Sequence, residues 1–250
     1  MSSGEQRAEA VRLLKSAADK VKRTGRVPFP PAFVIAAEGE KQEPPLARLI
    51  QGGRGGEVRL KLYMCITMMA TGKPYDLRTP PSPHGWTRML ALDPQKGPRR
   101  VASNLKWLGD NGFIRLEAQW GRPSAITLLS ATGDGKEYSQ PRGDGKRYVG
   151  VPLGFWIHGW LLCLSPTATA VLLALIEVLG GHSEARYIPT TRRQRYGLSP
   201  DTWTKARKEL EARSLLVVKR EPQGDFYDFM RLRNAYQLDL ERLDSPPNWW

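Results

Sequence analysis

The sequence of 250 residues contains few of the residues that build disulfide frameworks and metal sites. It has only two cysteines, Cys65 and Cys163, which lie far apart and each within an apolar run. Two such cysteines form neither a disulfide framework nor a recognisable metal-binding spacing. We therefore expect two buried, reduced thiols in a cytosolic protein.

Histidine is equally scarce, which argues against the common catalytic centres. His84, His158 and His182 are far apart, and none lies beside a cluster of acidic residues or a cysteine. The sequence thus offers no metal-ligand spacing and no general base for a nucleophile. Asp225 and Asp228 fall in a predicted strand and do not suggest a paired acid and base, and a nuclease would need a carboxylate cluster or a tyrosine beside histidines. We expect a protein that is not an enzyme and that uses no cofactor or small-molecule substrate.

The sequence also lacks an uninterrupted apolar segment of membrane-spanning length. Residues 1–25 are charged throughout, unlike a secretion signal. Residues 154–181 are mostly apolar, but Ser165-Pro166 is a helix-start signal that divides them into two pieces, each too short to cross a bilayer. We expect neither export nor a membrane span.

Positive charge is what the sequence has in excess. It contains 38 Lys and Arg against 25 Asp and Glu, which gives a net charge of +13. A field of this sign attracts polyanions and steers them towards the protein. Nucleic acid is the polyanion that we expect first, ahead of an anionic membrane surface.

The first 55 residues predict a helical arm followed by a connector. Apolar residues fall on one face of a helix over 5–24, whose other faces are charged. Such an arm packs on the body of the chain or on a partner subunit, which would make a homodimer; a basic helix that touches phosphates is the less favoured alternative. Prolines recur over 26–51, so we predict an irregular connector with a short helix over 46–50. The apolar residues of the arm are Val11, Leu14, Ala18 and Val21.

Residues 56–130 predict three helices followed by a β-hairpin. A mostly apolar helix over 57–72 is followed by a Pro-rich loop, and a short helix is expected over 86–92. A third helix begins at Gly97 or Pro98 and ends at the "GDNG" signal. Alternating apolar residues on both sides of "WGRPS" then indicate a hairpin. This order of elements is typical of a winged helix-turn-helix.

The next segment, 131–148, is rich in Gly and polar residues and has no apolar periodicity, which predicts a linker or a long surface loop. It contains "GDGK" at Gly133 and again at Gly143. Neither copy has the spacing of a phosphate-binding loop or opens an apolar helix. Tight Asp-Gly turns explain both copies better.

Residues 149–242 repeat the same order. The sequence predicts a helix over 166–179, a short strand and a short basic helix within "YIPTTRRQRYGLS", a third helix from Pro200 and a second hairpin. When the two units are aligned, Val101 matches Trp203, Leu108 matches Leu210, and Phe113-Ile114 matches Leu215-Leu216. The match is one of pattern and not of identity, so an ancient duplication is a hypothesis only.

The residues that we expect to contact DNA lie on the third helices, on the second basic helix and on the hairpins. The major groove admits a helix and presents a distinct pattern for every base pair, so a rigid helix with Arg, Lys, Asn, Ser or Thr on its outer face can read sequence. Hairpin cations can reach phosphates or a minor groove. In the first unit these residues are Arg99, Arg100, Ser103, Asn104, Lys106 and Arg122. In the second they are Thr190, Thr191, Arg192, Arg193, Arg195, Thr202, Thr204, Lys205, Lys208, Lys219, Arg220 and Gln223.

The tryptophans offer an alternative, because aromatic rings stack on the bases of single strands or RNA. Most of them fall at helical core spacing or beside a turn, so we expect burial instead. The residues considered are Trp86, Trp107, Trp120, Trp156, Trp160 and Trp203. The final pair, Trp249 and Trp250, is expected to be a frayed end.

The second unit resembles the winged-helix domain of plasmid replication initiator proteins and many actinobacterial winged-helix proteins. The shared features are an aromatic-rich strand before a helix that begins at Leu-Ser, the "RRQRYGLS" second helix, and "KARKELEARSLL" before a hairpin. The resemblance covers about residues 148–240, and the first unit shares only the order of elements. It implies binding to repeated sites at an origin; the sequence has no ATP-binding loop, so strand opening would come from DNA bending or from recruited proteins.

The expected architecture is a mainly α, α+β chain with small hairpins and two winged-helix units. The expected divisions are an arm and connector (1–55), the first unit (56–130), the linker (131–148), the second unit (149–242) and a tail (243–250). The expected function is sequence-specific binding of double-stranded DNA, as a replication initiator or a transcription regulator, in the cytoplasm on the nucleoid or a plasmid. The alternative is a non-catalytic module whose basic faces bind an acidic protein.

Overall fold

The computed structural model describes residues 3–40, 42–51, 54–141, 147–180, 182, 184–222 and 232–248. About 48% of the chain is helical and about 18% lies in strands, which form small antiparallel sheets. The expected α+β class is therefore confirmed.

The first group of elements, which we call the N-terminal unit, has three helices, a short strand and a hairpin. The short strand pairs with the last strand, so the sheet order is β2-β4-β3, antiparallel throughout. The sequence predicted a loop where β2 lies. The elements are α4 (Arg54–Met69), β2 (Asp76–Leu77), α5 (Pro83–Met89), α6 (Gly97–Asp110), β3 (Ile114–Gln119) and β4 (Arg122–Leu128).

The second group, the C-terminal unit, has the same order of elements and the same sheet connectivity. Its short strand again pairs with the last strand, in the order β6-β8-β7. The elements are α9 (Pro166–Leu179), β6 (Arg186–Tyr187), α10 (Thr190–Gln194), α11 (Pro200–Ala212), β7 (Leu216–Pro222) and β8 (Leu232–Leu238).

Ser-Pro pairs begin three of these helices. The hydroxyl oxygens of Ser82, Ser165 and Ser199 accept hydrogen bonds from backbone N–H groups in the first turns of α5, α9 and α11, at 3.1, 3.1 and 3.2 Å. The proline that follows each serine already has the backbone φ of a helix and has no N–H to leave unpaired. A local sequence signal thus explains where each helix starts.

Helix α6 ends in a left-handed turn that directs the chain into the hairpin. Gly112 has φ +72°, and the Phe113 N–H donates to the Leu108 carbonyl at 3.0 Å. Leu108 and Phe113 are both fully buried. The hydrogen bond and the apolar contact together form a common helix C-terminal motif.

Helix α11 ends in the same way with different residues. Ser214 has φ +58°, and the Leu215 N–H donates to the Leu210 carbonyl at 3.0 Å. Leu210 and Leu215 are fully buried, like their counterparts in the N-terminal unit. The sequence alignment matched Leu108 with Leu210 and Phe113 with Leu215. These matched positions have equivalent backbone geometry in the two units.

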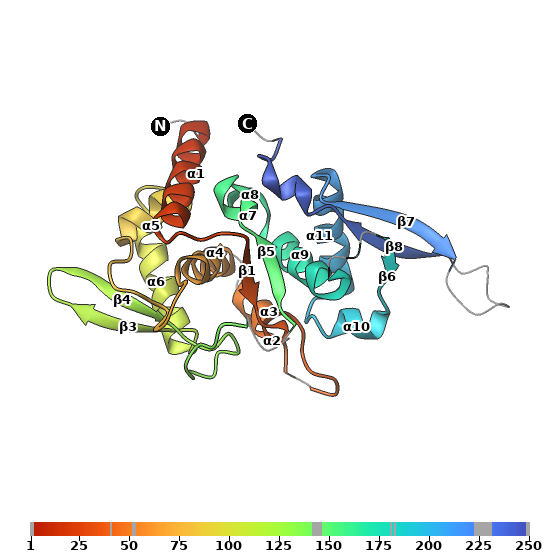
Figure 1. The fold of residues 1–250 in the computed structure, drawn as a ribbon, viewed down its shortest axis with the longest axis horizontal. Coiled ribbons are helices and arrows are strands. Elements are labelled where there is room, and N and C mark those ends of the chain that lie inside the picture. The colour runs from red at the N-terminus through yellow and green to blue at the C-terminus, as the bar shows by residue number, and fades with distance from the viewer. Residues whose placement is uncertain are drawn as a thin grey trace.

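The segments outside the two units lie between them and above them in Figure 1. β1 pairs antiparallel with β5, with Val27 opposite Val151, although the sequence predicted an irregular connector there. Helix α1 packs against α5 and α7 of its own chain, and α2 and α3 pack against α9. These elements are α1 (Ser3–Lys20), β1 (Arg26–Phe29), α2 (Pro31–Val34), α3 (Pro45–Ile50), β5 (Val149–Pro152), α7 (Gly154–Ile157), α8 (Trp160–Cys163) and the 3₁₀ helix η1 (Glu241–Asp244).

The buried apolar side chains form one continuous core that runs through both units. Helices α4 and α9 contact each other at its centre, and the core extends from Leu14 in α1 to Leu243 in η1. Arg23 strengthens this centre, because its buried guanidinium donates to the carbonyls of Thr67 and Met68, at the C-terminal end of α4, at 2.9 Å each. Tight packing of this kind holds the two units in a fixed relation.

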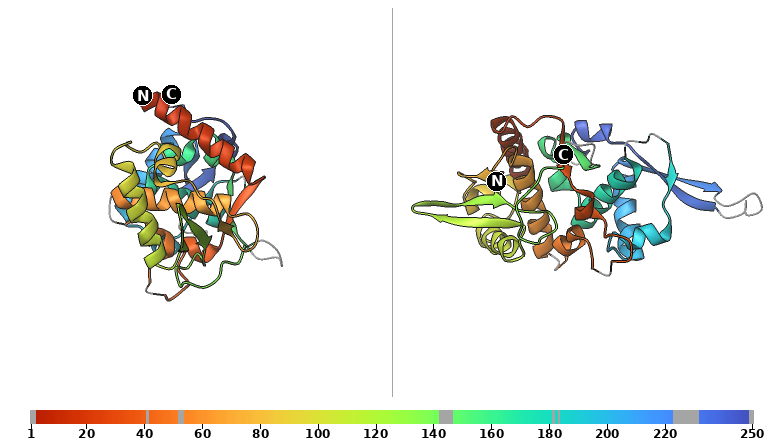
Figure 2. Two further views of the ribbon diagram at one scale, coloured as in Figure 1. Left: turned by 90° about the vertical axis from the view of Figure 1, so that its left-hand side faces the viewer. Right: turned by 60° about the horizontal axis from the view of Figure 1, so that its bottom comes forward.

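The two hairpins extend from opposite ends of the molecule. In Figure 1, β3 and β4 project to the left, whereas β7 and β8 project to the right. The right-hand view of Figure 2 shows the same elongated arrangement, whereas the left-hand view looks along the long axis.

The long apolar segment at 154–181 is divided, as its Ser-Pro pair predicted. Helix α8 ends at Cys163 and α9 begins at Pro166. No helix in the described part of the chain combines the length and the apolar character needed to cross a bilayer. Cys65 is buried as expected, whereas Cys163 is only partly so.

Candidate nucleic-acid interface

Helix α6 presents its cationic residues on the face opposite the core. Val101 and Leu108 are fully buried against α4, whereas Arg99, Ser103 and Lys106 are exposed. Lys106 Nζ lies 2.9 Å from a carboxylate oxygen of Asp110 one turn later, and this ion pair is itself exposed. Arg100 is half-buried.

The expectation that Asn104 lies on this outer face is wrong. Its side chain is only 7% exposed, and its amide nitrogen donates to the Arg100 carbonyl at 2.8 Å. Residue 104 is three residues after Val101 and four before Leu108, so helical geometry places it on the inner stripe. This spacing was present in the sequence and could have identified the position.

Helix α11 divides its residues in the same way. Trp203, Ala206 and Leu210 face the core, whereas Thr204, Lys205 and Lys208 are exposed and Thr202 is half-buried.

Two of these outward side chains already have partners on their own helix. Lys205 Nζ lies 2.8 Å from a carboxylate oxygen of Asp201, and that hydrogen bond raises the pKa of the lysine. The Thr204 hydroxyl donates to the Pro200 carbonyl at 2.8 Å. Lys208, one turn after Thr204, is therefore the clearest exposed cation of α11.

The basic helix α10 is held by a largely buried acid that the sequence analysis did not single out. One terminal nitrogen of Arg192 donates to both carboxylate oxygens of Glu177, at 2.8 and 2.9 Å, and the Tyr196 hydroxyl donates to the same carboxylate at 2.8 Å. Burial, and then the charge of Glu177, raise the pKa of Tyr196. This network ties α10 to α9, so Arg192 acts within the fold.

Arg195 is likewise used inside the chain. Its guanidinium donates twice to the Ala36 carbonyl, at 2.9 and 3.0 Å, and the Ala36 N–H donates to the Arg195 carbonyl at 3.0 Å. The expectation that Arg192 and Arg195 point outward to a ligand is therefore corrected, because both side chains fasten α10 to neighbouring segments. Arg193 is half-buried and donates to the exposed Thr190, while Thr191 is exposed.

The hairpins carry further exposed cations at the two ends of the molecule. Arg122 is exposed at the start of β4, and Lys219 and Arg220 are exposed on β7. Arg220 also makes a long contact, 3.5 Å, with the Leu232 carbonyl. Gln223 lies outside the described residues, as do Asp225 and Asp228.

The tryptophans that the structure describes fall into three groups. Trp107 is half-buried, and the Arg59 guanidinium lies 3.7 Å above its ring centre, a cation–π contact that the sequence analysis missed. Trp120 is 101% exposed, so the expectation of burial is wrong for this residue. Trp249 and Trp250 lie outside the described residues. The buried tryptophans, as expected, are Trp86, Trp156, Trp160 and Trp203.

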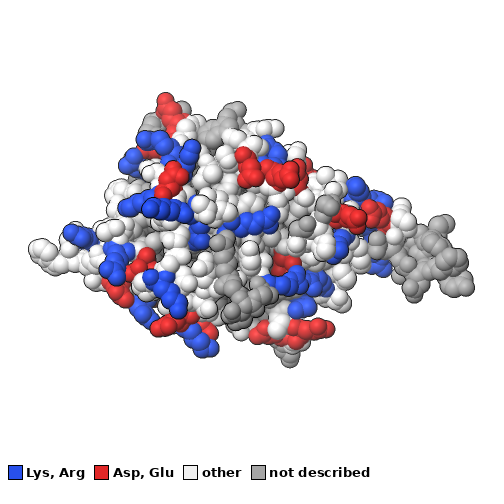
Figure 3. Space-filling model, in the orientation of Figure 1, with Lys and Arg blue, Asp and Glu red and all other residues white. Residues whose placement is uncertain are grey.

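Charges of both signs are mixed on the face shown in Figure 3. Blue and red side chains alternate over it, and neither colour forms a continuous area across both units. The excess of positive charge is therefore divided among separate elements on this face.

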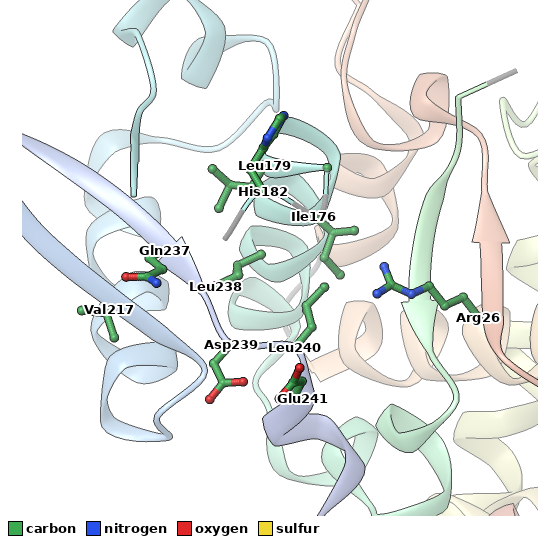
Figure 4. Close-up of a pocket in the computed structure, with 11 residues that line it drawn as sticks. Arg26, Ile176, Leu179, His182, Val217, Gln237, Leu238, Asp239, Leu240 and Glu241 are labelled. Carbon is green, nitrogen blue, oxygen red and sulfur yellow. The ribbon is translucent and has the colours of Figure 1, made fainter. Parts of the chain in front are cut away.

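The cavity drawn in Figure 4 lies where β1 meets the C-terminal unit, and it has a volume of about 430 Å³. Its wall combines apolar residues, such as Ile176 and Leu240, with polar and charged ones. In Figure 4 the charged groups of Asp239 and Glu241 lie at one edge of the cavity and that of Arg26 at another, so the three do not converge on one point. Ligand sites usually have converging polar groups, so this cavity is a weaker candidate than the cationic helix faces.

Among the described residues, no three His, Cys, Asp or Glu side chains are grouped so that they could hold a metal ion. Comparisons with protein-family models, with curated proteins and with solved structures gave no match.

Proposed function

We propose that this protein binds double-stranded DNA in a sequence-specific manner through two winged-helix units, and that it does so without catalysing a reaction. The observation that carries the proposal is the repeated order of helix, short strand, two helices and hairpin, with cations on the outer face of both third helices. A braced helix with such a face fits the major groove, where base edges are distinguishable.

The N-terminal unit would read DNA with Arg99 and Ser103 near the start of α6, and the C-terminal unit with Lys208 on α11. Arg122 and Lys219 on the hairpins would contact phosphates beside each reading helix. Because the hairpins extend to opposite ends of the molecule, the bound site would cover about two helical turns.

The shared core gives this proposal a geometric consequence. The two units are joined through the contact between α4 and α9 and through the pairing of β1 with β5. A pair of readers held in this way recognises two half-sites at one spacing only. Adding about five base pairs between the half-sites would rotate one half-site to the opposite side of the duplex and abolish simultaneous binding.

An origin of replication or a promoter would suit this architecture, and both would place the protein on a plasmid or nucleoid in the cytoplasm. The resemblance of the C-terminal unit to plasmid replication initiators suggests an origin, whereas a promoter-binding regulator would use the same scaffold and the same basic helices. A homodimer through α1 stays a prediction, because that helix already packs on α5 and α7 of its own chain.

The test is selection of bound duplexes from a random-sequence library by the full chain, followed by footprinting of the recovered site and titration at several salt concentrations. We expect a site with two separated half-sites and affinity that falls steeply as salt rises. Arg122→Ala should weaken protection at one end of the site and Lys219→Ala at the other. Each substitution should reduce the slope of the logarithm of affinity against the logarithm of salt concentration by about one.

The matched control is Asp110→Ala, which removes the acid that pairs with Lys106 and leaves the cations in place. The proposal would be refuted if the selection recovered no preferred duplex and if Arg99→Ala and Lys208→Ala left the affinity for DNA unchanged.

A second candidate function is a module that binds an acidic protein. It is favoured by the mixture of charges on the face shown in Figure 3, where no continuous cationic area for a duplex extends across both units. This candidate predicts that random duplexes compete for binding to the protein as well as any selected duplex does. It also predicts that an acidic polypeptide displaces both kinds of duplex from the protein.

A further inference from the structure

The tip of the first hairpin carries one large aromatic side chain that the fold does not use. Trp120 is 101% exposed, and it forms the turn between β3 and β4 together with Gly121, whose φ is +66°. The flanking residues Gln119 and Arg122 are opposite each other in the strand register. Aromatic side chains bury about 150–250 Å² each when they pack, and this indole leaves that surface available for contact with a ligand.

The surroundings of Trp120 are polar and cationic. Arg122 is exposed beside it, and Gln119 donates to the Arg78 carbonyl at 3.1 Å. The Arg78 side chain is largely exposed, but its Nε lies 3.1 Å from a carboxylate oxygen of Asp76, so its charge is paired. The other exposed large apolar residue of this hairpin is Leu116, which lies on the strand against α6, near Gly109. The tip therefore has no apolar patch beyond the indole itself.

This composition distinguishes between two kinds of partner. A stable protein interface buries about 800 Å² on each side, which is several times what one indole supplies. A single aromatic ring beside an exposed arginine is instead an arrangement that stacks on nucleobases while the cation contacts a phosphate. Apolar side chains on such projections also enter the minor groove and separate adjacent base pairs.

The hairpin is long enough to reach the neighbouring groove. Strand β3 has six residues, which extend for about 20 Å. Half a turn of the duplex is about 17 Å, so a tip at this distance from a helix in the major groove can meet the adjacent minor groove.

We propose that Trp120 inserts its indole into a base step from the minor groove and unstacks the duplex beside the bound site. The inference rests on the proposed function and adds to it a local deformation of the DNA. Contacts with the indole would partly replace the lost stacking between bases. The chain would then supply by itself a first step of strand opening or bending.

The test uses the full chain and a duplex that it has selected from a random library, with 2-aminopurine placed at successive positions. Thymine oxidation by permanganate serves as a second readout of unstacking. The variants are Trp120→Ala, the conservative Trp120→Phe and the matched control Leu116→Ala, which removes another exposed apolar group from the same hairpin. Because Trp120 is fully exposed, we expect unchanged unfolding curves for its variants.

We expect wild type, Trp120→Phe and Leu116→Ala to raise 2-aminopurine fluorescence and thymine reactivity at one position. Trp120→Ala should lose both signals and bind roughly tenfold more weakly while keeping the same sequence preference. If Trp120→Ala unstacks the duplex as wild type does, or if wild type unstacks no position, the inference fails and DNA binding stands. Absence of any preferred duplex would instead overturn the proposed function. Binding of wild type, but not of Trp120→Ala, to phosphatidylserine vesicles with unchanged DNA binding would assign the indole to a membrane surface.

Discussion

The N-terminal and C-terminal units share one topology but stabilise it with different chemistry. In the N-terminal unit, the inner face of α6 uses Val101 and the amide of Asn104, and no buried ion pair was found between its described helices. In the C-terminal unit, the corresponding face of α11 uses Trp203, and α10 is fastened by the Glu177–Arg192 pair.

This difference shows that cations with similar positions in a sequence pattern can have opposite roles. The arginines of α10 lie close to a buried carboxylate and a backbone carbonyl, so two of them became part of the fold. Arg99 and Lys106 of α6 are exposed, and Lys106 pairs with Asp110, an exposed acid of the same helix. The repeat therefore conserves the order of elements more closely than it conserves the use of each charged residue.

The largest expected effect on stability comes from the aromatic residue of α11. Trp203 is 2% exposed and stacks on Tyr196 with ring centres 5.7 Å apart. Trp203→Ala should lower the free energy of unfolding by about 3–5 kcal/mol, because it leaves a large cavity. Val101→Ala at the matched position of α6 should cost about 2 kcal/mol, since it removes only two buried methyl groups. Urea unfolding measures both; equal costs would show that the two cores do not differ as described.

The next largest effect on stability tests the ion pair between Glu177 and Arg192, which joins α9 to α10 in the C-terminal unit. Glu177→Ala leaves Arg192 without its partner and should cost about 2–3 kcal/mol, less than a fully buried pair because 31% of the Arg192 side chain is exposed. The control Asp110→Ala breaks an exposed pair on α6 and should change stability by less than about 0.5 kcal/mol. Thermal unfolding of both variants compares them, and a Glu177→Ala protein as stable as the control would contradict the assigned role.

A smaller effect distinguishes the two helix ends. Gly112→Ala should cost about 2 kcal/mol, because its φ is +72° and an added Cβ would lie 2.7 Å from the Gly135 backbone nitrogen. Ser214 takes a similar conformation at the end of α11 despite its side chain. Ser214→Gly should therefore stabilise the protein by about 0.5 kcal/mol. Glycine relieves the backbone strain at this positive φ, but part of that gain is lost because glycine has greater chain entropy in the unfolded state. Chemical denaturation checks both directions of change, and a destabilised Ser214→Gly variant would argue against strain there.

The smallest effect concerns the polar side chains before the two third helices, a turn-forming aspartate before α6 and a capping serine at α11. Asp93 accepts hydrogen bonds from the Lys96 and Gln95 N–H groups at 2.7 and 3.0 Å in the turn that leads into α6, and the Lys96 bond is the main cause of its lowered pKa. A carboxylate whose pKa is lower in the folded state stabilises that state above its unfolded pKa, and the contribution is lost as the pH falls through the folded pKa.

The cap of α11 is the Ser199 hydroxyl, which does not titrate in this range. The difference in stability between wild type and Asp93→Asn should therefore shrink below about pH 4. Ser199→Ala should cost about 1 kcal/mol at every pH. Unfolding curves from pH 7 to pH 3 measure both, and a constant difference for Asp93→Asn would contradict the role given to the Asp93 carboxylate in this turn.

Local features of the structure followed well from the sequence. Ser-Pro pairs and apolar spacing predicted α9 with its observed bounds, the start of α11 and the short helix α3. The start of α6 at Gly97 was also predicted. These features depend on hydrogen bonds and side chains within a few residues of each other, and so the sequence pattern contains the necessary information.

The sequence by itself determined the α+β class, the positions of most helices and hairpins, and the excess of positive charge, because these depend on composition and on near neighbours in the chain. Only the tertiary structure decided that β1 pairs with β5, that Arg192 and Arg195 turn inward, and that Trp120 remains in solvent. Each of these depends on contacts, or on their absence, between segments far apart in the chain. Local periodicity has no information about which distant carboxylate, carbonyl or apolar surface will lie beside a side chain.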